Sequence, residues 1–171
     1  TKNNLEILDY AFANTAVETI DLPSGGITIG AYAFYNAADL RAVNIETGSN
    51  LQNIGAYAFN GTALASMDFS KAAALEEIGA YAFCETALDK IVLADAVTSV
   101  GNYAFYGCAN VTELRLSSSI SNIGEYAFAK IPKITAVTIS GNDTKVGNSA
   151  FEDCSSLKDI TLESGVSSIG N

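Results

Sequence analysis

The chain has 171 residues, no histidine and no tryptophan, and nine Lys and Arg against 19 Asp and Glu, which gives a formal net charge of −10. The lack of histidine excludes Ser-His-Asp and Cys-His catalysis, two-histidine metal sites and a histidine pH switch. The excess of carboxylates argues against nucleic acid as a partner, because a phosphate backbone requires clustered Lys and Arg. No apolar run approaches the ~20 residues of a transmembrane helix, so we expect no membrane insertion.

The first motif of each repeat is the tripeptide Tyr-Ala-Phe, which occurs six times, with Ser-Ala-Phe as a seventh copy. Successive phenylalanines lie 22 to 25 residues apart. A period of this length indicates a solenoid, in which each repeat adds one rung to a continuous core. We therefore expect the phenylalanines to stack into a structural ladder. Its members are Phe12, Phe34, Phe59, Phe83, Phe105, Phe128 and Phe151.

The tyrosines of the same motif form a second predicted column. They are Tyr10, Tyr32, Tyr57, Tyr81, Tyr103 and Tyr126. Their position beside the core phenylalanines favours a half-buried ladder with hydroxyls at the surface. The alternative is an aromatic stripe that stacks on sugars. We expect a helical turn near each Tyr-Ala-Phe.

The second motif, L-x-x-I-x-L, follows each phenylalanine by five or six residues, as in Leu40, Val43 and Ile45. The last two apolar residues alternate with outward positions, as in a strand with one buried face. Parallel copies of such strands stack about 4.8 Å apart. Two repeats are longer by two residues, and we expect the additions to form loop bulges within residues 47–53 and 70–76.

The third motif is Ile or Val followed by glycine. The glycines are Gly30, Gly55, Gly79, Gly101, Gly124, Gly147 and Gly170. A glycine at a fixed position in every rung indicates either a positive φ or a close approach of two backbones. The first repeat departs from the pattern, since it has Ile7-Leu8 at this place. We expect a second short strand near each of these motifs.

The three cysteines are expected to be buried structural thiols. Cys108 and Cys154 hold the same position two rungs apart, so about 10 Å separates them. A disulfide requires Cα atoms within ~7 Å, so these two should not bridge. Cys84 sits at a different position of its repeat. One cysteine per rung is also not the cluster that a metal site requires.

The three motifs in phase resemble the BspA-like leucine-rich repeat family of bacterial surface proteins. The resemblance rests on L-x-x-I-x-L followed by I-G-x-x-A-F-x-x-C, and it extends from about Ile7 to Gly170. The cysteine position departs from the family pattern, because only Cys108 and Cys154 occupy it. The resemblance implies a curved solenoid with parallel strands on the concave side. It also implies a secreted or surface-exposed protein of a host-associated microbe, used in adhesion and protein binding.

The expected fold class is therefore an α/β repeat solenoid. In detail, we expect a right-handed leucine-rich-repeat superhelix with short parallel strands on its concave side and about seven repeats of 22–25 residues. Residues 1–171 are expected to form a single leucine-rich-repeat domain. Because solenoids need polar end repeats, we also expect this domain to be part of a longer chain.

The outward positions of the predicted strands are the candidate binding face. These residues vary from rung to rung while the core does not, as on a surface that carries specificity on a fixed scaffold. Lys90 and Glu113 face each other on adjacent rungs and are expected to form a weak ion pair. The face has no large aromatic anchors, so we expect modest affinity. The candidates are Asp21, Asn44, Glu46, Asp68, Lys90, Glu113, Arg115, Thr138 and Thr161.

The leading functional prediction is a non-enzymatic, extracellular or cell-surface module for protein binding or adhesion. The expected partner is a host or microbial surface protein or a glycan, without a cofactor, and the oligomeric state stays open. One alternative is a structural spacer with no ligand of its own. The other is a polysaccharide-active enzyme, which would need a carboxylate pair in a groove. Asp21 and Asp68 lie two rungs apart on an open face, which fits neither hydrolysis nor a calcium site well.

Overall fold

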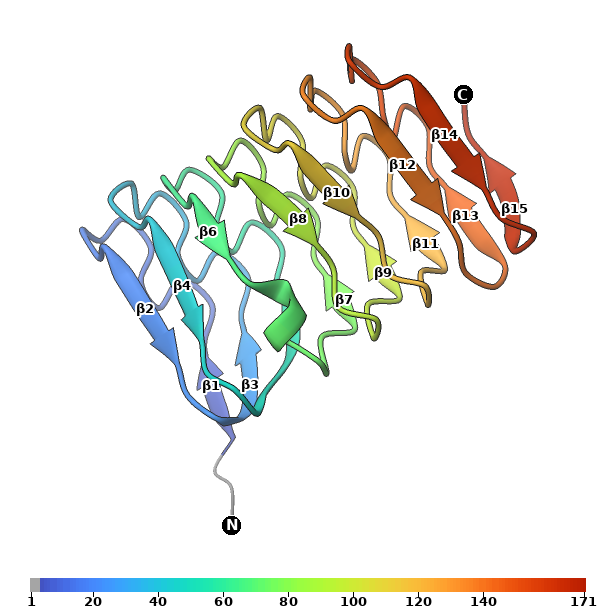
Figure 1. The fold of residues 1–171 in the computed structure, drawn as a ribbon. Coiled ribbons are helices and arrows are strands. Elements are labelled where there is room, and N and C mark those ends of the chain that lie inside the picture. Colours follow the sequence, from blue (N-terminus) through green and yellow to red (C-terminus); the bar gives the residue numbers. More distant parts are fainter. Residues whose placement is uncertain (1–3) are drawn as a thin grey trace.

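Residues 4–171 are described by the structure, a computed structural model. They form a parallel-strand β-solenoid of about seven turns, whose rungs follow one another in chain order from the N-terminal to the C-terminal end (Figure 1). Each turn contributes one strand to each of two rows, and the core lies between the rows. The first three residues of the expected domain lie outside the described part of the chain.

The strands that end at the Ile or Val before each of the seven glycines, together with β1 before Leu8, form one continuous eight-stranded sheet, which we call the continuous sheet. Its register aligns Ile7 with Ile29 and Ile29 with Ile54, so the buried branched residues form one column. The expected second strand of each repeat is thus confirmed. The strands are β1 (Leu5–Ile7), β3 (Gly25–Ile29), β5 (Ser49–Ile54), β7 (Glu77–Ile78), β9 (Ser99–Val100), β11 (Asn122–Ile123), β13 (Thr144–Val146) and β15 (Val166–Ile169).

The L-x-x-I-x-L motifs form the second row, which is parallel as expected but interrupted. It consists of three separate sheets, β2-β4-β6, β8-β10 and β12-β14. The ladder is broken between β6 and β8 and again between β10 and β12, which the sequence did not predict. The strands are β2 (Thr19–Leu22), β4 (Ala42–Ile45), β6 (Ser66–Met67), β8 (Lys90–Val92), β10 (Glu113–Arg115), β12 (Ala136–Ile139) and β14 (Asp159–Leu162).

The α/β part of the expected fold class is not confirmed. Within residues 4–171 the only helix is the three-residue 3-10 helix η1 (Phe69–Lys71). The expected helical turn at Tyr-Ala-Phe is replaced by successive tight turns. There, the N–H groups of Tyr32 and Phe34 donate to the next rung, to Ala56 and Ala58, at 2.8 Å each. The right-handed superhelix and the concave position of the strands stay predictions.

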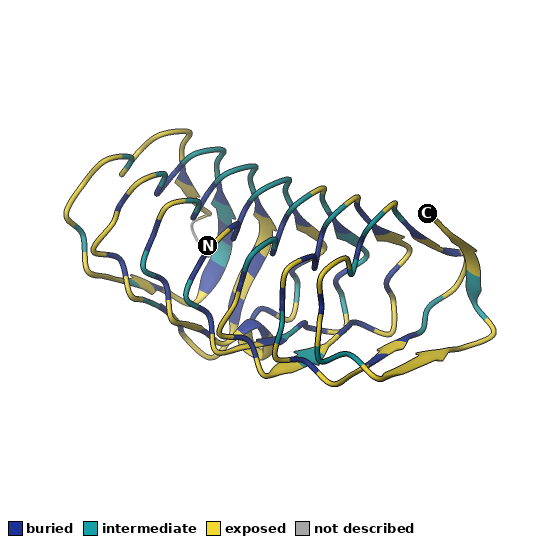
Figure 2. Ribbon diagram, turned by 90° about the horizontal axis from the view of Figure 1, so that it is seen from above, coloured by how far each residue is buried: buried dark blue, intermediate teal, exposed yellow. Residues whose placement is uncertain are grey.

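The phenylalanine ladder forms the centre of the core, as predicted. The rings of Phe34, Phe59, Phe83, Phe105 and Phe128 are fully buried. Neighbouring rings along this run are stacked, with centroids 5.1–5.4 Å apart. The ladder loosens at its ends, where Phe12 is 40% exposed and Phe151 is partly exposed. Figure 2 shows buried segments in the internal rungs, whereas the rungs at both ends of the stack are mostly exposed.

The glycine of each rung is required by a close backbone approach. A Cβ atom added at Gly55 would lie only 2.5 Å from the backbone nitrogen of Ala31 in the preceding rung. Contacts under 3.0 Å are not tolerated there, since the neighbour is backbone rather than a flexible side chain. Of the two explanations that the sequence left open, the structure therefore selects close approach over positive φ.

The tyrosines adopt an unusual backbone conformation that the sequence did not reveal. All six have a positive φ between 54° and 59°. The left-handed region costs roughly 1–2 kcal/mol for a residue with a Cβ atom. Ser149, which replaces tyrosine in the seventh copy, also has a positive φ, and in all seven copies a second positive φ follows four residues later. The sequence does carry a signal at this second place, because Asn, Asp and Gly fill most of its copies. They are Asn14, Asn36, Gly61, Glu85, Gly107, Lys130 and Asp153.

The two longer repeats place their additional residues in the connections, as expected. In one, a turn at Gly48 leads into β5, whose pairing with β3 shifts register after Leu51. In the other, η1 follows β6 directly and inserts Phe69 into the core against Phe83 and Phe105. This helix ends β6 after two residues, which accounts for the first break in the strand row.

Candidate binding face

All nine candidate residues lie exposed on the outward side of the interrupted row, which we call the strand face. Seven of them stand within the strands, whereas Glu46 and Asp68 directly follow β4 and β6. The inward residues between them are mostly buried, so each short strand fixes the direction of its outward side chains. The structure thus confirms their exposure and common face, and a role in binding stays a prediction.

The first rungs of the strand face carry acidic and amide groups held by local hydrogen bonds. Asp21 and Asn44 are aligned on β2 and β4, and the Asn44 Nδ2 donates to Asp21 Oδ1 at 2.8 Å. The Glu46 carboxylate accepts the backbone N–H of Ser24 at 3.1 Å. Each of these two carboxylates therefore has an uncharged hydrogen-bond partner and lies at the surface.

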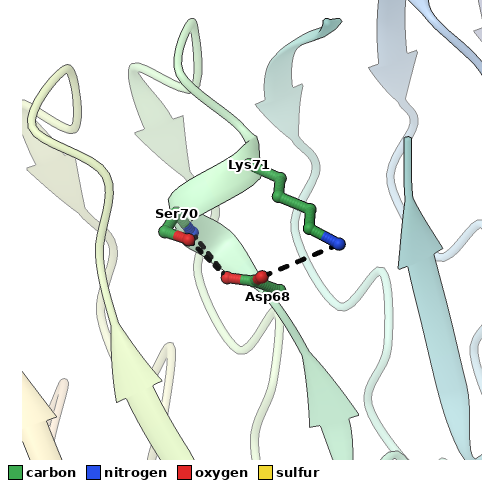
Figure 3. A network of polar contacts seen from close by, with 3 residues as sticks. All are labelled: Asp68, Ser70 and Lys71. Atoms are coloured by element: carbon green, nitrogen blue, oxygen red, sulfur yellow. Dashed lines mark hydrogen bonds and ion pairs between the residues drawn. The ribbon is translucent and has the colours of Figure 1, made fainter. Parts of the chain in front are cut away.

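Asp68 is the first residue after β6 and caps η1 (Figure 3). Its Oδ1 accepts the backbone N–H of Ser70 at 3.2 Å and the Ser70 hydroxyl at 2.6 Å. Its other oxygen lies 3.9 Å from the Lys71 Nζ. Both charged side chains are half exposed, so this pair is weak and open to an incoming group.

A hollow of about 320 Å³ lies beside Asp68, at the break between β6 and β8. Two lysines and two aspartates meet there with the Asn44 amide, over a floor of strand residues. The lining of this hollow therefore combines positively charged hydrogen-bond donors with negatively charged acceptors. Its polar side chains are Asn44, Ser66, Asp68, Lys71, Asp89 and Lys90.

A larger hollow of about 540 Å³ lies at the second break, between β10 and β12. Its apolar floor includes Leu114, which is only partly buried, and Val137. Arg115 stands at its side, with an Nη2 3.9 Å from the Asp95 carboxylate. Both of these side chains are at least two-thirds exposed, so the guanidinium keeps most of its donors for other partners. Hydroxyls of Ser118, Thr138 and Ser140 complete the lining.

The expected ion pair between Lys90 and Glu113 is not formed. The two residues are aligned on β8 and β10, as the sequence indicated. Among residues 4–171, however, the ion pairs within 4.0 Å are those of Lys71 with Asp68 and of Arg115 with Asp95. Lys90 instead lines the smaller hollow on the other side of its strand. Sequence reasoning also missed Asp95 and Ser118, because they follow their strands outside the periodic positions.

The tyrosine column is a half-buried ladder, as favoured by the sequence. Consecutive rings stack with centroids 4.6–4.8 Å apart and interplanar angles of 3–16°. Each internal ring is therefore covered on both faces by its neighbours. Because sugars stack on free ring faces, the internal rings of this column offer them only edges and hydroxyls.

The cysteines are free and buried, which confirms their structural interpretation. The Cys108 thiol donates to the carbonyl of Phe83 in the preceding rung at 3.2 Å. Burial raises the pKa of this thiol to about 12, so it stays protonated and unreactive at neutral pH. Threonine fills this position in other rungs and bonds within its own rung instead, as in Thr62, whose hydroxyl donates to the Phe59 carbonyl at 2.7 Å.

The described residues hold no group of three or more metal-ligating Cys, Asp or Glu side chains. In the same part of the chain, no helix reaches the length and hydropathy needed to cross a membrane. The aspartates considered for sugar hydrolysis are engaged separately, Asp21 with Asn44 and Asp68 with Ser70. They do not share one hollow, since only Asp68 lines the smaller depression.

Comparison with known proteins agrees with the fold. The model of the BspA type leucine-rich repeat region matches residues 5–75 and 76–171, in six copies. A leucine-rich repeat protein of T. pallidum, TpLRR, superposes with a TM-score of 0.74 at 24% identity, over 90% of this chain and 72% of that one. No curated protein matches the chain.

Two further solved structures resemble the chain more distantly. A leucine-rich repeat protein from Bacteroides ovatus has 22% identity and a TM-score of 0.41, over 95% of this chain. The pneumococcal vaccine antigen PcpA has 20% identity and a TM-score of 0.46, over 92% of this chain. The chain spans 59% of the length of each of these two proteins.

Proposed function

Because the chain belongs to the family of BspA-type leucine-rich repeat proteins, we propose that it is a non-enzymatic binding or adhesion module of a bacterial surface. In this proposal the strand face contacts the partner, which is a surface protein of a host or another microbe, or a glycan. The rigid core and the continuous sheet serve as the scaffold.

One observation carries the proposal: the strand row is interrupted twice, and a hollow lies at each interruption. A regular ladder would present a flat surface with side chains in even columns. The breaks instead create two depressions, and both are lined by residues that differ from rung to rung. Depressions of this kind let a partner bury surface that a flat face cannot enclose.

The chemistry of the two hollows favours a polar partner. The smaller one joins two lysines with two aspartates, and the larger one joins Arg115 with hydroxyl groups over an apolar floor. Both are open, and large aromatic anchors are absent from their linings in the described residues. Contacts of this type give modest affinity for one module, which repeated display on a surface would raise through multivalency.

The proposal is tested by attachment of the purified chain to a panel of matrix proteins and glycans. The test variant is the double substitution Asp68→Lys and Arg115→Glu, which reverses one exposed charge beside each hollow. A matched control is the double substitution Lys145→Glu and Glu77→Lys, which keeps the same net charge but changes the exposed side of the continuous sheet. We expect the first variant to lose attachment and the control to retain it.

Four results would contradict the proposal. Equal loss in both double variants would point to the other side of the solenoid or to overall charge. Equal binding by all three proteins would remove the strand face from the interaction. Binding to no member of the panel would favour the spacer alternative, and release of reducing sugar from the glycans would favour the enzyme alternative. Because Asp68→Lys also removes the cap of η1, each variant must be shown to stay folded well above the assay temperature, so that lost attachment reports on contact rather than folding.

A further inference from the structure

The position two residues after each phenylalanine, where the second positive φ of the repeat occurs, links one rung to the next through its backbone N–H group. Six copies of this position are followed by a described rung, and in five of them the N–H donates to a carbonyl of that rung at 2.7–2.9 Å. In each case the acceptor is the residue directly after the next phenylalanine. The five donors are Asn14, Asn36, Glu85, Gly107 and Lys130.

The sixth copy is Gly61, whose backbone N–H finds no hydrogen-bond acceptor among residues 4–171. The carbonyl that the pattern assigns to it is that of Cys84, the residue directly after Phe83. This carbonyl instead lies 3.5 Å from the side-chain Nδ2 of Asn60, at the long end of the hydrogen-bonding range. The Asn60 amide therefore occupies the place of the missing bond, beside the backbone nitrogen of Gly61.

Asn60 and Gly61 form the single Asn-Gly dipeptide of the chain. Asparagine is a chemically labile residue, and its usual route of decay is attack of the following backbone nitrogen on the side-chain carbonyl carbon. A following glycine favours this attack, because it has no side chain to hinder ring closure and the widest choice of backbone angles. The attacking nitrogen must also be free of other bonds, as the Gly61 nitrogen is. Asn60 is partly buried and Gly61 is exposed, so water and hydroxide reach the nitrogen.

We propose that Asn60 is a site of spontaneous modification in the folded protein, at which the Gly61 nitrogen closes a succinimide ring and the amide is lost as ammonia. Hydroxide removes the Gly61 N–H proton, and the nitrogen forms a bond to Asn60 Cγ. The bond from Cγ to Nδ2 then breaks, and the departing nitrogen takes a proton from water. A further water molecule opens the ring at either carbonyl, which yields an aspartyl or an isoaspartyl residue. The reactants are the chain and water alone.

The isoaspartyl product conflicts with the stacking of the rungs. Asn36 in the preceding rung donates its backbone N–H to the Asn60 carbonyl at 2.9 Å. Its side-chain oxygen also packs so closely on Gly61 that an added Cβ atom would collide with it. In the isoaspartyl product the Asn60 carbonyl becomes a carboxylate outside the main chain, and a further carbon enters the chain before Gly61. The turn can then no longer keep both contacts, so the modification weakens this rung.

The test follows the folded wild-type chain during incubation at neutral and mildly alkaline pH. Peptide mass spectrometry measures loss of each side-chain amide, and enzymatic methylation detects isoaspartyl groups. We expect the Asn60 amide to be lost first among the asparagines of the chain, and faster at the higher pH. Ring closure through glutamine is slower because the ring is larger, so Asn60→Gln should keep its amide under the same conditions.

The matched control is Tyr106→Asn, which places a second Asn-Gly pair at the same position of a later rung. There the Gly107 N–H is engaged, since it donates to the Ala129 carbonyl at 2.9 Å. In the folded chain we expect Asn60 to convert faster than this introduced asparagine, whereas in denaturant the two should convert at similar rates. Circular dichroism before incubation verifies that the variant is folded.

A second measurement separates the altered main chain from the added charge. Asn60→Asp carries the charge of the product on a normal main chain. We expect the isolated isoaspartyl fraction of the wild type to melt at a lower temperature than freshly purified Asn60→Asp. Equal melting temperatures would contradict the packing of this turn between two rungs.

Three further results would overturn the proposal. An intact Asn60 in the folded chain, with conversion only in denaturant, would show that the fold protects the site. Equal conversion of Asn60 and of the asparagine introduced by Tyr106→Asn in the folded chain would remove the free Gly61 N–H as the cause. Loss of the Asn60 amide without an isoaspartyl product, or without acceleration at higher pH, would exclude ring closure by the Gly61 nitrogen.

Discussion

The continuous sheet and the interrupted strand row are built by the same repeats around the same core, yet only one of them pairs without a break. The continuous sheet is bordered by the glycine position and by the stacked tyrosines. Each of these contacts allows only one distance between neighbouring rungs. The strand row has no such constraint on its outward side. In one longer repeat the additional residues form η1, where the strand row opens, whereas in the other the continuous sheet takes them up as a register shift between β3 and β5 without a break.

This difference suits the two rows to different roles. A row with fixed spacing gives a rigid scaffold, but its surface repeats regularly. A row that can open varies in shape as well as in side chains, and it is the one that carries the candidate binding residues. Four substitutions test how far this division holds, in order of decreasing expected effect on stability.

Phe105→Ala removes a ring on which both rows rest. Phe105 is fully buried and stacks with Phe83 and Phe128. We expect a loss of about 3–5 kcal/mol in the free energy of unfolding, from lost burial and the cavity left behind. Denaturant unfolding measures it. Phe12→Ala at the 40% exposed end of the ladder should cost clearly less. Equal effects would contradict the placement of the core.

Gly79→Ala changes a contact of the continuous sheet and leaves the strand row unaltered. The added Cβ atom would meet the Ala56 nitrogen at 2.5 Å, so the backbones of two rungs must move apart. Overpacking of this kind costs roughly 1–3 kcal/mol. Leu8→Ala is the matched control, because it leaves a Cβ atom at the equivalent place of the first described rung, where the side chain is exposed. Unchanged thermal unfolding of Gly79→Ala would mean that this sheet does not fix the spacing.

Tyr81 tests whether ring stacking maintains a strained backbone beside the continuous sheet. Its φ of 58° disfavours any residue with a Cβ atom, while its ring stacks on Tyr57 and Tyr103. Tyr81→Ala and Tyr81→Gly both lose the stacking, but only glycine relieves the strain. We therefore expect Tyr81→Gly to be about 1 kcal/mol more stable than Tyr81→Ala. The reverse order in denaturant unfolding, which is usual within strands, would refute the explanation.

Asp68→Ala examines the first break in the strand row. The substitution removes the bonds from Asp68 to the Ser70 N–H and hydroxyl at the start of η1. Loss of such a cap costs about 1 kcal/mol, and Asp68→Asn should retain most of it. The comparison by thermal unfolding also separates capping from binding. If Asp68→Asn keeps its stability but weakens attachment, the charge itself contacts the partner.

Much of the fold could be predicted, because the residues that make each contact between rungs recur in seven copies of the repeat. The buried phenylalanines, the branched residues before glycine and the outward position of residues such as Arg115 all follow from periods of two and about 23 residues. The prediction of a helical turn at Tyr-Ala-Phe was wrong, because tyrosine carries no sequence signal for a positive φ. The predicted ion pair of Lys90 with Glu113 was also wrong, since alignment on adjacent strands brings two side chains near each other without fixing their directions.

The sequence by itself determined the number of rungs, the residues that point inward and the position at which glycine is required. These properties depend on contacts between one rung and the next, which are the same at every step. Only the tertiary structure decided which row stays continuous, where the other opens and which side chains line the hollows. Those features depend on small differences between rungs, such as the insertion of Phe69 and η1, whose effect is set by the spacing that the rest of the stack imposes.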